Sequence, residues 1–170
     1  MDFKDKKVLV SGIAKSGISA AILLKKLGAD VTVQDAKTED KLGETAAELK
    51  NEGFNMYLGS NPDDIIEDMD ILVMSPGVPT DLPFVNKARE KNIPVIGEIE
   101  LAYLFCKSPV IGITGTNGKT TTTTLVGDIC KEYFKNTFVV GNIGNPFADI
   151  ALETEKDGVV AAELSSFQLE

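Results

Sequence analysis

The sequence predicts an α/β protein built on parallel sheets. Short apolar runs rich in Val, Ile and Leu alternate with helix-period segments along the whole 170-residue chain, which is typical of βαβ units. Two of these runs end in glycine-rich turns, at residues 12–17 and 115–118, and each such turn favours a sheet of its own. We therefore expect two domains, residues 1–97 and 98–170, with the boundary in the segment 93–98.

Each expected strand is a short, largely apolar run bounded by polar or turn residues. These runs are 7–11, 31–35, 54–58, 70–74, 93–97, 110–114, 137–141 and 158–163. Each expected helix lies between two such runs, where apolar residues recur at three- and four-residue intervals. These segments are 17–27, 43–52, 62–68, 83–91, 98–106, 119–134 and 146–153.

Composition and charge narrow the classes of function. The formal net charge is −9 and aromatic residues make up 6% of the chain, whereas nucleic-acid binding needs a basic face and stacking aromatic side chains. Histidine is absent, so the chain supplies no imidazole, either as a base or as a zinc ligand. Cys106 and Cys130 lie in apolar helical patterns, as buried reduced thiols do. No signal peptide is seen, and no apolar run approaches the roughly 18 residues of a membrane span. We expect a cytoplasmic protein that binds neither nucleic acid nor membrane.

The segment 110–121 is the strongest functional signal. A β-branched run enters a glycine-rich turn, which delivers Lys119 and Thr120 onto the start of a helix. In a nucleotide-phosphate site of this kind, backbone N–H groups face the phosphates, the lysine reaches the β- and γ-phosphates and the threonine hydroxyl holds Mg²⁺. The spacing departs from the strict Walker pattern, since Ile113 stands five residues before Gly118. The alternative is a tight strand-to-helix turn that carries Lys-Thr by chance. The predicted ATP-binding residues are Gly115, Thr116, Asn117, Gly118, Lys119, Thr120 and Thr121.

Polar clusters follow the last two expected strands. Gly-Asn-Ile-Gly-Asn-Pro occupies 141–146, and Glu163 begins a polar run at the end of an apolar strand. A carboxylate at a strand end, in the same sheet as a phosphate-binding loop, is a usual ligand for Mg²⁺, which keeps several of its waters. Glu163 and Thr120 are therefore the predicted metal ligands. The alternative for Glu163 is a surface glutamate at a strand end.

The first glycine-rich turn also indicates a nucleotide. It reads Gly-Ile-Ala-Lys-Ser-Gly over 12–17, with Ala14 where the dinucleotide fingerprint has its second glycine, and Asp35 ends the next strand. An acidic side chain there accepts a ribose hydroxyl, which suggests NAD, but the methyl group of Ala14 limits the approach of a pyrophosphate and leaves a differently held nucleotide equally open. The alternative for Asp35 is a solvated strand end. A third turn, Ser-Pro-Gly at 75–77, is either a further part of this site or a proline-stiffened turn.

These motifs together resemble the Mur ligase family. The resemblance is carried by Gly-Thr-Asn-Gly-Lys-Thr-Thr at 115–121, Gly-Asn-Ile-Gly at 141–144 and Glu-Leu-Ser-Ser-Phe-Gln-Leu at 163–169. It implies a cytoplasmic enzyme of peptidoglycan synthesis with a Rossmann-like N-terminal domain for UDP, a central P-loop ATPase-type domain for ATP and a C-terminal domain. Lys119 and Glu163 are the implied catalytic residues. The residues that the resemblance implies for the UDP-substrate are Lys15, Ser16, Asp35, Ala36, Lys37, Ser75, Gly77, Asn142, Ser165 and Gln168.

The resemblance also implies a reaction. The carboxylate of UDP-N-acetylmuramoyl-L-alanine attacks the γ-phosphate of ATP, and D-glutamate then displaces phosphate from the acyl phosphate, with Mg²⁺ as cofactor. Because the family's central domain is longer than the matching part of this chain, we expect a complete UDP-binding domain followed by the first part of the ATPase domain, and no ligase activity from these 170 residues alone. Two rival hypotheses are a nucleotide-binding or regulatory module without catalysis, and an NAD-dependent oxidoreductase, although hydride transfer has no use for a phosphate-binding loop.

Overall fold

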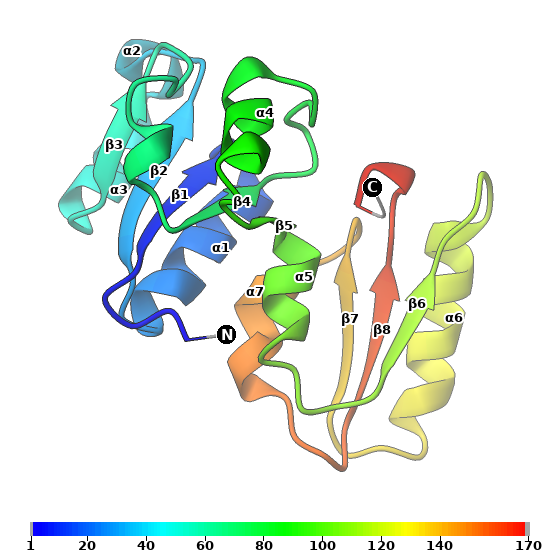
Figure 1. Ribbon diagram of the computed structural model, residues 1–170. Helices are drawn as coiled ribbons and strands as arrows, with labels where there is room; N and C mark the ends of the chain where they lie inside the picture. The colour runs from blue at the N-terminus through cyan, green and yellow to red at the C-terminus, as the bar shows by residue number, and fades with distance from the viewer. Residues whose placement is uncertain (1, 169–170) are drawn as a thin grey trace. The chain divides into compact units, whose positions relative to one another are not determined.

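The computed structural model describes residues 2–168, and the chain divides into two compact units, Met1–Glu98 and Ile99–Glu170. Each unit is built around its own parallel sheet (Figure 1). The predicted α/β class is therefore confirmed, and all eight expected strands are present with ends that shift by at most two residues. The ligand-binding roles expected of the two domains stay predictions.

The first unit holds a five-stranded sheet in the order β3-β2-β1-β4-β5. Residues 8–10 of β1 and 71–74 of β4 are all buried, because strands covered on both faces carry apolar side chains at successive positions. The chain leaves β1 toward β2 and β3 on one side, and β4 and β5 lie on the other side. The carboxyl ends of β1 and β4 therefore form a topological switch point, where open α/β sheets bind ligands. The strands are β1 (Lys7–Ser11), β2 (Asp30–Asp35), β3 (Asn55–Leu58), β4 (Ile71–Met74) and β5 (Val95–Gly97).

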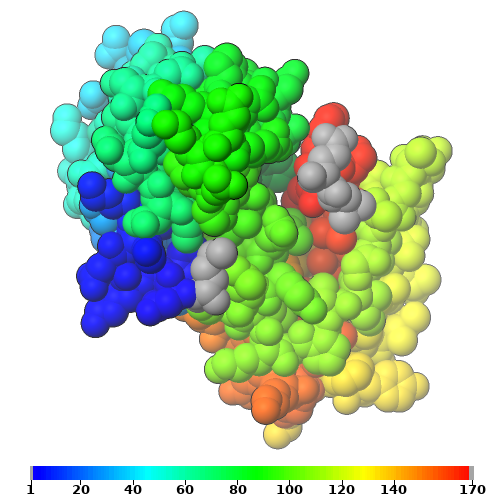
Figure 2. Space-filling model, viewed as in Figure 1, coloured from blue at the N-terminus to red at the C-terminus, as the bar shows by residue number. Residues whose placement is uncertain are grey.

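Helices pack against this sheet through small clusters of apolar side chains. Phe84, Val85 and Ala88 of α4 are buried against Leu9 and Leu72 of the central strands. In Figure 2 the atoms of this unit, coloured blue to green, form a densely covered surface over the elements drawn in Figure 1. The α4 helix begins at a proline, which suits a first turn because that turn has no intrahelical acceptor for the missing N–H. The helices are α1 (Lys15–Lys26), α2 (Glu39–Leu42), α3 (Glu44–Asn51) and α4 (Pro83–Glu90), with one 3-10 turn, η1 (Ile66–Asp68).

In this unit one predicted helix is wrong, and one short helix was not predicted. The helix expected over 62–68 is only the short turn η1. The segment is closed mainly by i to i+3 bonds, from Ile65 N–H to the Pro62 carbonyl at 3.3 Å and from Asp68 N–H to the Ile65 carbonyl at 3.1 Å. Such i to i+3 turns rarely extend beyond a few residues. The four-residue helix α2 was not expected. None of its residues is buried, so no apolar periodicity marks it.

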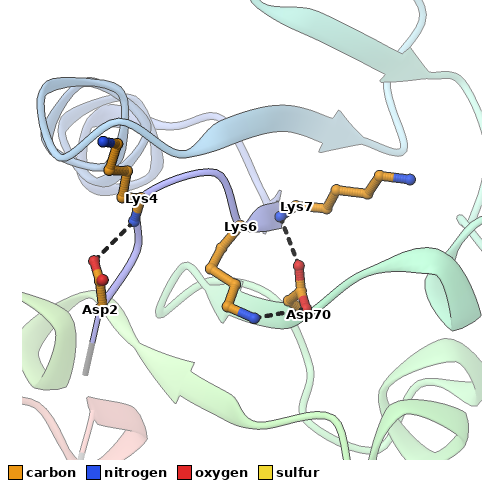
Figure 3. A network of polar contacts seen from close by, with 5 residues as sticks. All are labelled: Asp2, Lys4, Lys6, Lys7 and Asp70. Carbon is orange, nitrogen blue, oxygen red and sulfur yellow. Dashed lines mark hydrogen bonds and ion pairs between the residues drawn. The ribbon is translucent and has the colours of Figure 1, made fainter.

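The amino ends of β1 and β4 are joined by the side chain of Asp70 (Figure 3). One carboxylate oxygen accepts the backbone N–H of Lys7 at 2.9 Å, and the other accepts from Lys6 Nζ at 3.2 Å. The Lys7 backbone bond, followed by the Lys6 side chain, lowers the pKa of Asp70 below its usual value. Asp70 therefore helps to set the register in which Val8 lies beside Ile71.

The second unit holds a three-stranded parallel sheet in the order β6-β8-β7. The β8 strand is central and every one of its residues is buried, while the edge strand β6 exposes Ile111 by 40%. The helix α6 leads from β6 to β7 and buries Thr123, Gly127 and Cys130. The elements are α5 (Glu98–Tyr103), β6 (Val110–Ile113), α6 (Lys119–Lys131), β7 (Thr137–Gly141), α7 (Phe147–Ile150), η2 (Ala151–Glu153), β8 (Val159–Glu163) and η3 (Ser166–Gln168).

This unit exposes several large apolar side chains. Leu125 and Ile129 of α6 are more than half exposed, and Tyr133 beyond the helix is 83% exposed. Their spacing of four residues places them on one side of the helical path, away from the three buried α6 positions. Within residues 2–168, no helix combines the length and the apolar character needed to cross a membrane.

Candidate functional site

In the first unit, three turns at the carboxyl ends of β1, β2 and β4 approach one another closely. Gly12 adopts a φ of +84°, and a Cβ atom there would lie 2.6 Å from a methyl carbon of Val78. A Cβ atom on Gly17 would lie 1.8 Å from the Gly12 carbonyl oxygen and 2.5 Å from Ser75 Oγ. Both glycines are therefore required by close packing, which brings the first and third predicted turns together.

Asp35 ties the second turn to the first. One of its carboxylate oxygens accepts the backbone N–H of Ile13 at 3.2 Å, and the other accepts that of Lys37 at 2.9 Å. Each carboxylate oxygen can accept a further hydrogen bond, so this half-buried side chain remains able to bind a ribose hydroxyl. Asp35 is not merely a solvated strand end.

Ser75 has a structural task as well as a predicted binding one. Its hydroxyl is buried and donates to the Gly12 carbonyl at 2.5 Å, and its backbone N–H donates to the Ser11 carbonyl at 2.9 Å. The other residues predicted to contact the UDP-substrate in this unit lie around the same strand ends and are exposed or half-buried, namely Lys15, Ser16, Ala36, Lys37 and Gly77.

The sequence reasoning missed Gln34, a buried polar residue of β2. Its Oε1 accepts from Ser11 Oγ at 2.7 Å, and its Nε2 donates to the Ser60 carbonyl at 2.9 Å. Buried amides are hydrogen-bonded in folded proteins, and this one links β1, β2 and the loop after β3. The signal that could have found it is a glutamine inside an otherwise apolar strand.

In the second unit, the loop after β6 is exposed and depends on glycine. Gly115 has a φ of +150°, and Gly118 has a φ of +76° at the position just before α6. Lys119 Nζ donates to the Gly115 carbonyl at 2.6 Å, so the lysine lies over the loop. The first turn of a helix leaves its backbone N–H groups without intrahelical acceptors, and in α6 these belong to residues 119–121. The loop thus offers N–H donors and an ammonium group to an anion.

Glu163 lies at the end of the central strand β8, between Ile113 of β6 and Gly141 of β7. The residue is 1% exposed, and Asn142 Nδ2 donates to its Oε1 at 3.0 Å. Its Oε2 is buried and has no hydrogen-bond partner among residues 2–168. A buried carboxylate oxygen without a partner costs free energy, so this atom is suited to coordinate a cation. The interpretation of Glu163 as a surface residue is wrong.

The predicted residues Ser165 and Gln168 contact each other. Gln168 Oε1 accepts both the backbone N–H of Ser165, at 2.9 Å, and its hydroxyl, at 3.0 Å. These bonds close the turn that follows β8 and keep it beside the end of the strand. Within residues 2–168 no group of three or more His, Cys, Asp and Glu side chains could hold a metal ion. A metal here would take only one or two protein oxygens, as Mg²⁺ does when it is shared with phosphates.

Comparisons with known proteins give the chain a family context. Residues 6–97 match the family described as "Mur ligase MurD-like, N-terminal domain", and residues 113–170 match "Mur ligase middle domain". The chain is 50% identical over its whole length to a UDP-N-acetylmuramoylalanine--D-glutamate ligase of Lachnoclostridium phytofermentans and 51% identical to one of Clostridioides difficile. In both comparisons the aligned region covers 100% of this chain and 38% of the relative. The chain thus spans well under half of these relatives.

Solved structures agree on the fold. A pseudomurein peptide ligase type C from Methanothermus fervidus is 28% identical, with a TM-score of 0.54 over 95% of this chain and 33% of that protein. The UDP-N-acetylmuramate-alanine ligase of Thermotoga maritima is 24% identical, with a TM-score of 0.55 over 94% of this chain and 37% of that protein. At 24% identity, the likeness to the second structure shows the fold alone.

Proposed function

Because this chain belongs to the Mur ligase family, we propose that it is the N-terminal part of an ATP-dependent, ADP-forming ligase that joins D-glutamate to UDP-N-acetylmuramoyl-L-alanine. The names of relatives near 50% identity support this substrate pair. The structural observation that carries the proposal is Glu163, whose unpartnered Oε2 is buried at the end of β8 in the same small sheet as the glycine-rich loop. An enzyme that consumes ATP in this way would work in the cytoplasm.

The first unit would bind the UDP portion of the substrate. Its three turns present Asp35 for a ribose hydroxyl and place Lys15 at the start of α1. The N-terminus of that helix has positive potential, which favours a diphosphate. Ala14 occupies the last position before α1, where a methyl group keeps a pyrophosphate from the closest backbone approach. This arrangement favours a UDP-sugar over NAD, whose fingerprint needs glycine there.

The second unit would bind ATP. The N–H groups at the start of α6 and the ammonium group of Lys119 would contact the phosphates, while the Thr120 hydroxyl and Glu163 Oε2 would hold Mg²⁺. When bound, Mg²⁺ would neutralise phosphate charge and so lower the barrier to nucleophilic attack. Lys119 would exchange its bond to the Gly115 carbonyl for one to a phosphate oxygen, where a charge-assisted bond is stronger.

In the proposed reaction, a carboxylate oxygen of the substrate bonds to the γ-phosphorus of ATP as the bond to the bridging oxygen breaks, which releases ADP. The amine of D-glutamate then forms the amide, loses a proton and displaces inorganic phosphate. Phosphoryl transfer needs little covalent chemistry from the protein, so positioning and charge neutralisation dominate. This fits a chain without histidine, because neither step as written uses an imidazole from these residues.

The test of the ATP site is calorimetry of this chain with ATP and Mg²⁺. Lys119→Ala should weaken ATP binding by about 1.5–3 kcal/mol, the usual loss for a hydrogen bond to a charged group. The matched control is Lys131→Ala at the other end of α6, where the lysine pairs with Asp128 at 2.9 Å. Equal ATP affinity in wild type and Lys119→Ala would show that the loop is a structural turn and not a phosphate site.

A further inference from the structure

The two oxygens of the Glu163 carboxylate have different surroundings. Oε1 accepts a hydrogen bond from Asn142 Nδ2 at 3.0 Å, while Oε2 is equally enclosed but has no partner among residues 2–168. Because Glu163 is only 1% exposed, bulk water does not reach Oε2 to supply the missing hydrogen bond. Oε1 is therefore used to hold the side chain, while Oε2 keeps its capacity to accept a ligand.

Asn142 holds residue 163 at two points. Its backbone N–H donates to the Glu163 carbonyl at 2.9 Å, in addition to the side-chain bond. The preceding Gly141 makes this approach possible, because a Cβ atom there would lie 2.2 Å from the same carbonyl oxygen and its φ is +103°. The segment after β7 is therefore built to lie directly against the end of β8, with the carboxamide over the carboxylate.

The chemistry of the carboxamide matters. Toward a carboxylate, an asparagine must present its NH₂ group, since the carbonyl end has no proton to donate. The amide is neutral, so it orients Glu163 without cancelling its charge. A lysine or arginine in the same place would form an ion pair and compete with a metal for the carboxylate. Metal-binding side chains are commonly oriented in this way by a neighbouring hydrogen bond.

We propose that Asn142 is a positioning residue, which fixes the Glu163 carboxylate so that Oε2 alone is presented to the divalent cation bound with ATP. The sequence resemblance implied a different role for Asn142, a contact with the UDP-substrate. The inference rests on the proposed function, because it requires a metal bound with ATP at Glu163. It predicts that Asn142 affects metal-coupled nucleotide binding even when no UDP-substrate is present.

The test compares the ATP affinity of this chain in Mg²⁺ with its ATP affinity in EDTA, both by calorimetry. The ratio of the two affinities measures how far the metal strengthens ATP binding. Asn142→Ala should lower this ratio roughly 10- to 100-fold, the usual effect of removing a residue that orients a metal ligand, and should leave the affinity in EDTA unchanged. Asn145→Ala is the matched control, because it removes an exposed carboxamide of the same segment and should leave both affinities at wild-type values.

Two further variants separate the possible failures. If Glu163→Gln lowers the ratio but Asn142→Ala does not, the inference about Asn142 is wrong and the proposed metal site stands. If neither variant lowers it, the metal site is wrong as well. Thermal unfolding checks that each variant is folded; should Asn142→Ala fail this check, Asn142→Ser, whose hydroxyl is too short to replace the carboxamide, decides by the same ratio. Equal losses in Asn142→Ala and Asn145→Ala would also overturn the proposal, because the effect would then belong to the segment as a whole.

Discussion

At the scale of single residues, Asp35 holds two turns of the fold together and is also the proposed acceptor for a ribose hydroxyl. Its two oxygens accept the N–H groups of Ile13 and Lys37, so removing it both loosens two turns and deletes the predicted acceptor for a ribose hydroxyl. Asp35→Ala should weaken binding of UDP-N-acetylmuramoyl-L-alanine by about 1–3 kcal/mol. Calorimetry on this chain measures the loss directly.

The control for this prediction is Asp40→Ala, which removes an exposed carboxylate of α2 and should leave the affinity unchanged. The competing ligand is NAD, titrated in the same way. If NAD binds more tightly than the UDP-substrate to the unaltered chain, or if Asp35→Ala binds the UDP-substrate as well as the wild type does, the assignment of this edge to UDP is wrong.

The residue scale also marks the limit of reasoning from sequence. Glu163 was predicted as a metal ligand because it follows an apolar strand, which is a local signal. Its bond with Asn142 was not predicted, because it joins positions 21 residues apart through a strand pairing that a single sequence does not specify. Gln34 was missed for the same reason, since its partners Ser11 and Ser60 come from other elements.

At the scale of elements, η1 and α4 are joined by an exposed ion-pair cluster with a measurable pH signature. Glu67 contacts Lys87 Nζ at 2.8 Å and Lys91 Nζ at 2.9 Å. The hydrogen bond from Lys87, and then that from Lys91, lower the pKa of Glu67 from 4.5 to about 2. Because the folded value lies below the unfolded one, the stabilisation is present above pH 4.5 and is lost as the pH falls toward 2.

Glu67→Gln should therefore reduce the loss of folding stability between pH 4.5 and pH 2, as measured by denaturant unfolding at a series of pH values. The difference from wild type should shrink at high salt, because the three side chains are partly exposed to solvent and are screened. Asp68→Asn, an exposed neighbour in the same turn, is the control and should retain the wild-type profile in this range. Parallel wild-type and Glu67→Gln profiles would contradict the prediction.

Elements were predicted best where burial imposes a pattern. The strands were predicted correctly because a sheet covered on both faces requires consecutive apolar residues, as in residues 71–74 of β4 and 159–162 of β8. The short helical segments η1 and α2 were not predicted correctly. The segment 62–68 has apolar residues at helical spacing, yet Ile66 is its only fully buried large side chain, and so little burial cannot stabilise a full helix.

At the scale of the whole chain, the second unit presents an unusual surface for an α/β layer. Its sheet has three strands, the edge strand β6 exposes Ile111, and α6 exposes Leu125 and Ile129. Single exposed apolar residues are ordinary, whereas Leu125 and Ile129 lie four residues apart on one side of α6 and are both more than half exposed. Catalysis requires its groups to be held within fractions of an ångström, and in this unit Lys119 and Glu163 depend on a sheet of only three strands for their positions.

We accordingly predict that these 170 residues bind ATP and the UDP-substrate but do not by themselves ligate D-glutamate. The relatives named as ligases are covered only to 38% by this chain. Among residues 2–168, Glu163 holds the one buried carboxylate oxygen without a hydrogen-bond partner, and no group of three or more His, Cys, Asp and Glu side chains could hold a metal ion. The purified chain is incubated with ATP, Mg²⁺, UDP-N-acetylmuramoyl-L-alanine and D-glutamate, and phosphate release is followed. The full-length Clostridioides difficile relative, tested in parallel, is the positive control and should release phosphate only when both substrates are present. Release from the 170-residue chain with the same dependence on both substrates would show that the complete ligase site lies within it, and would refute the prediction.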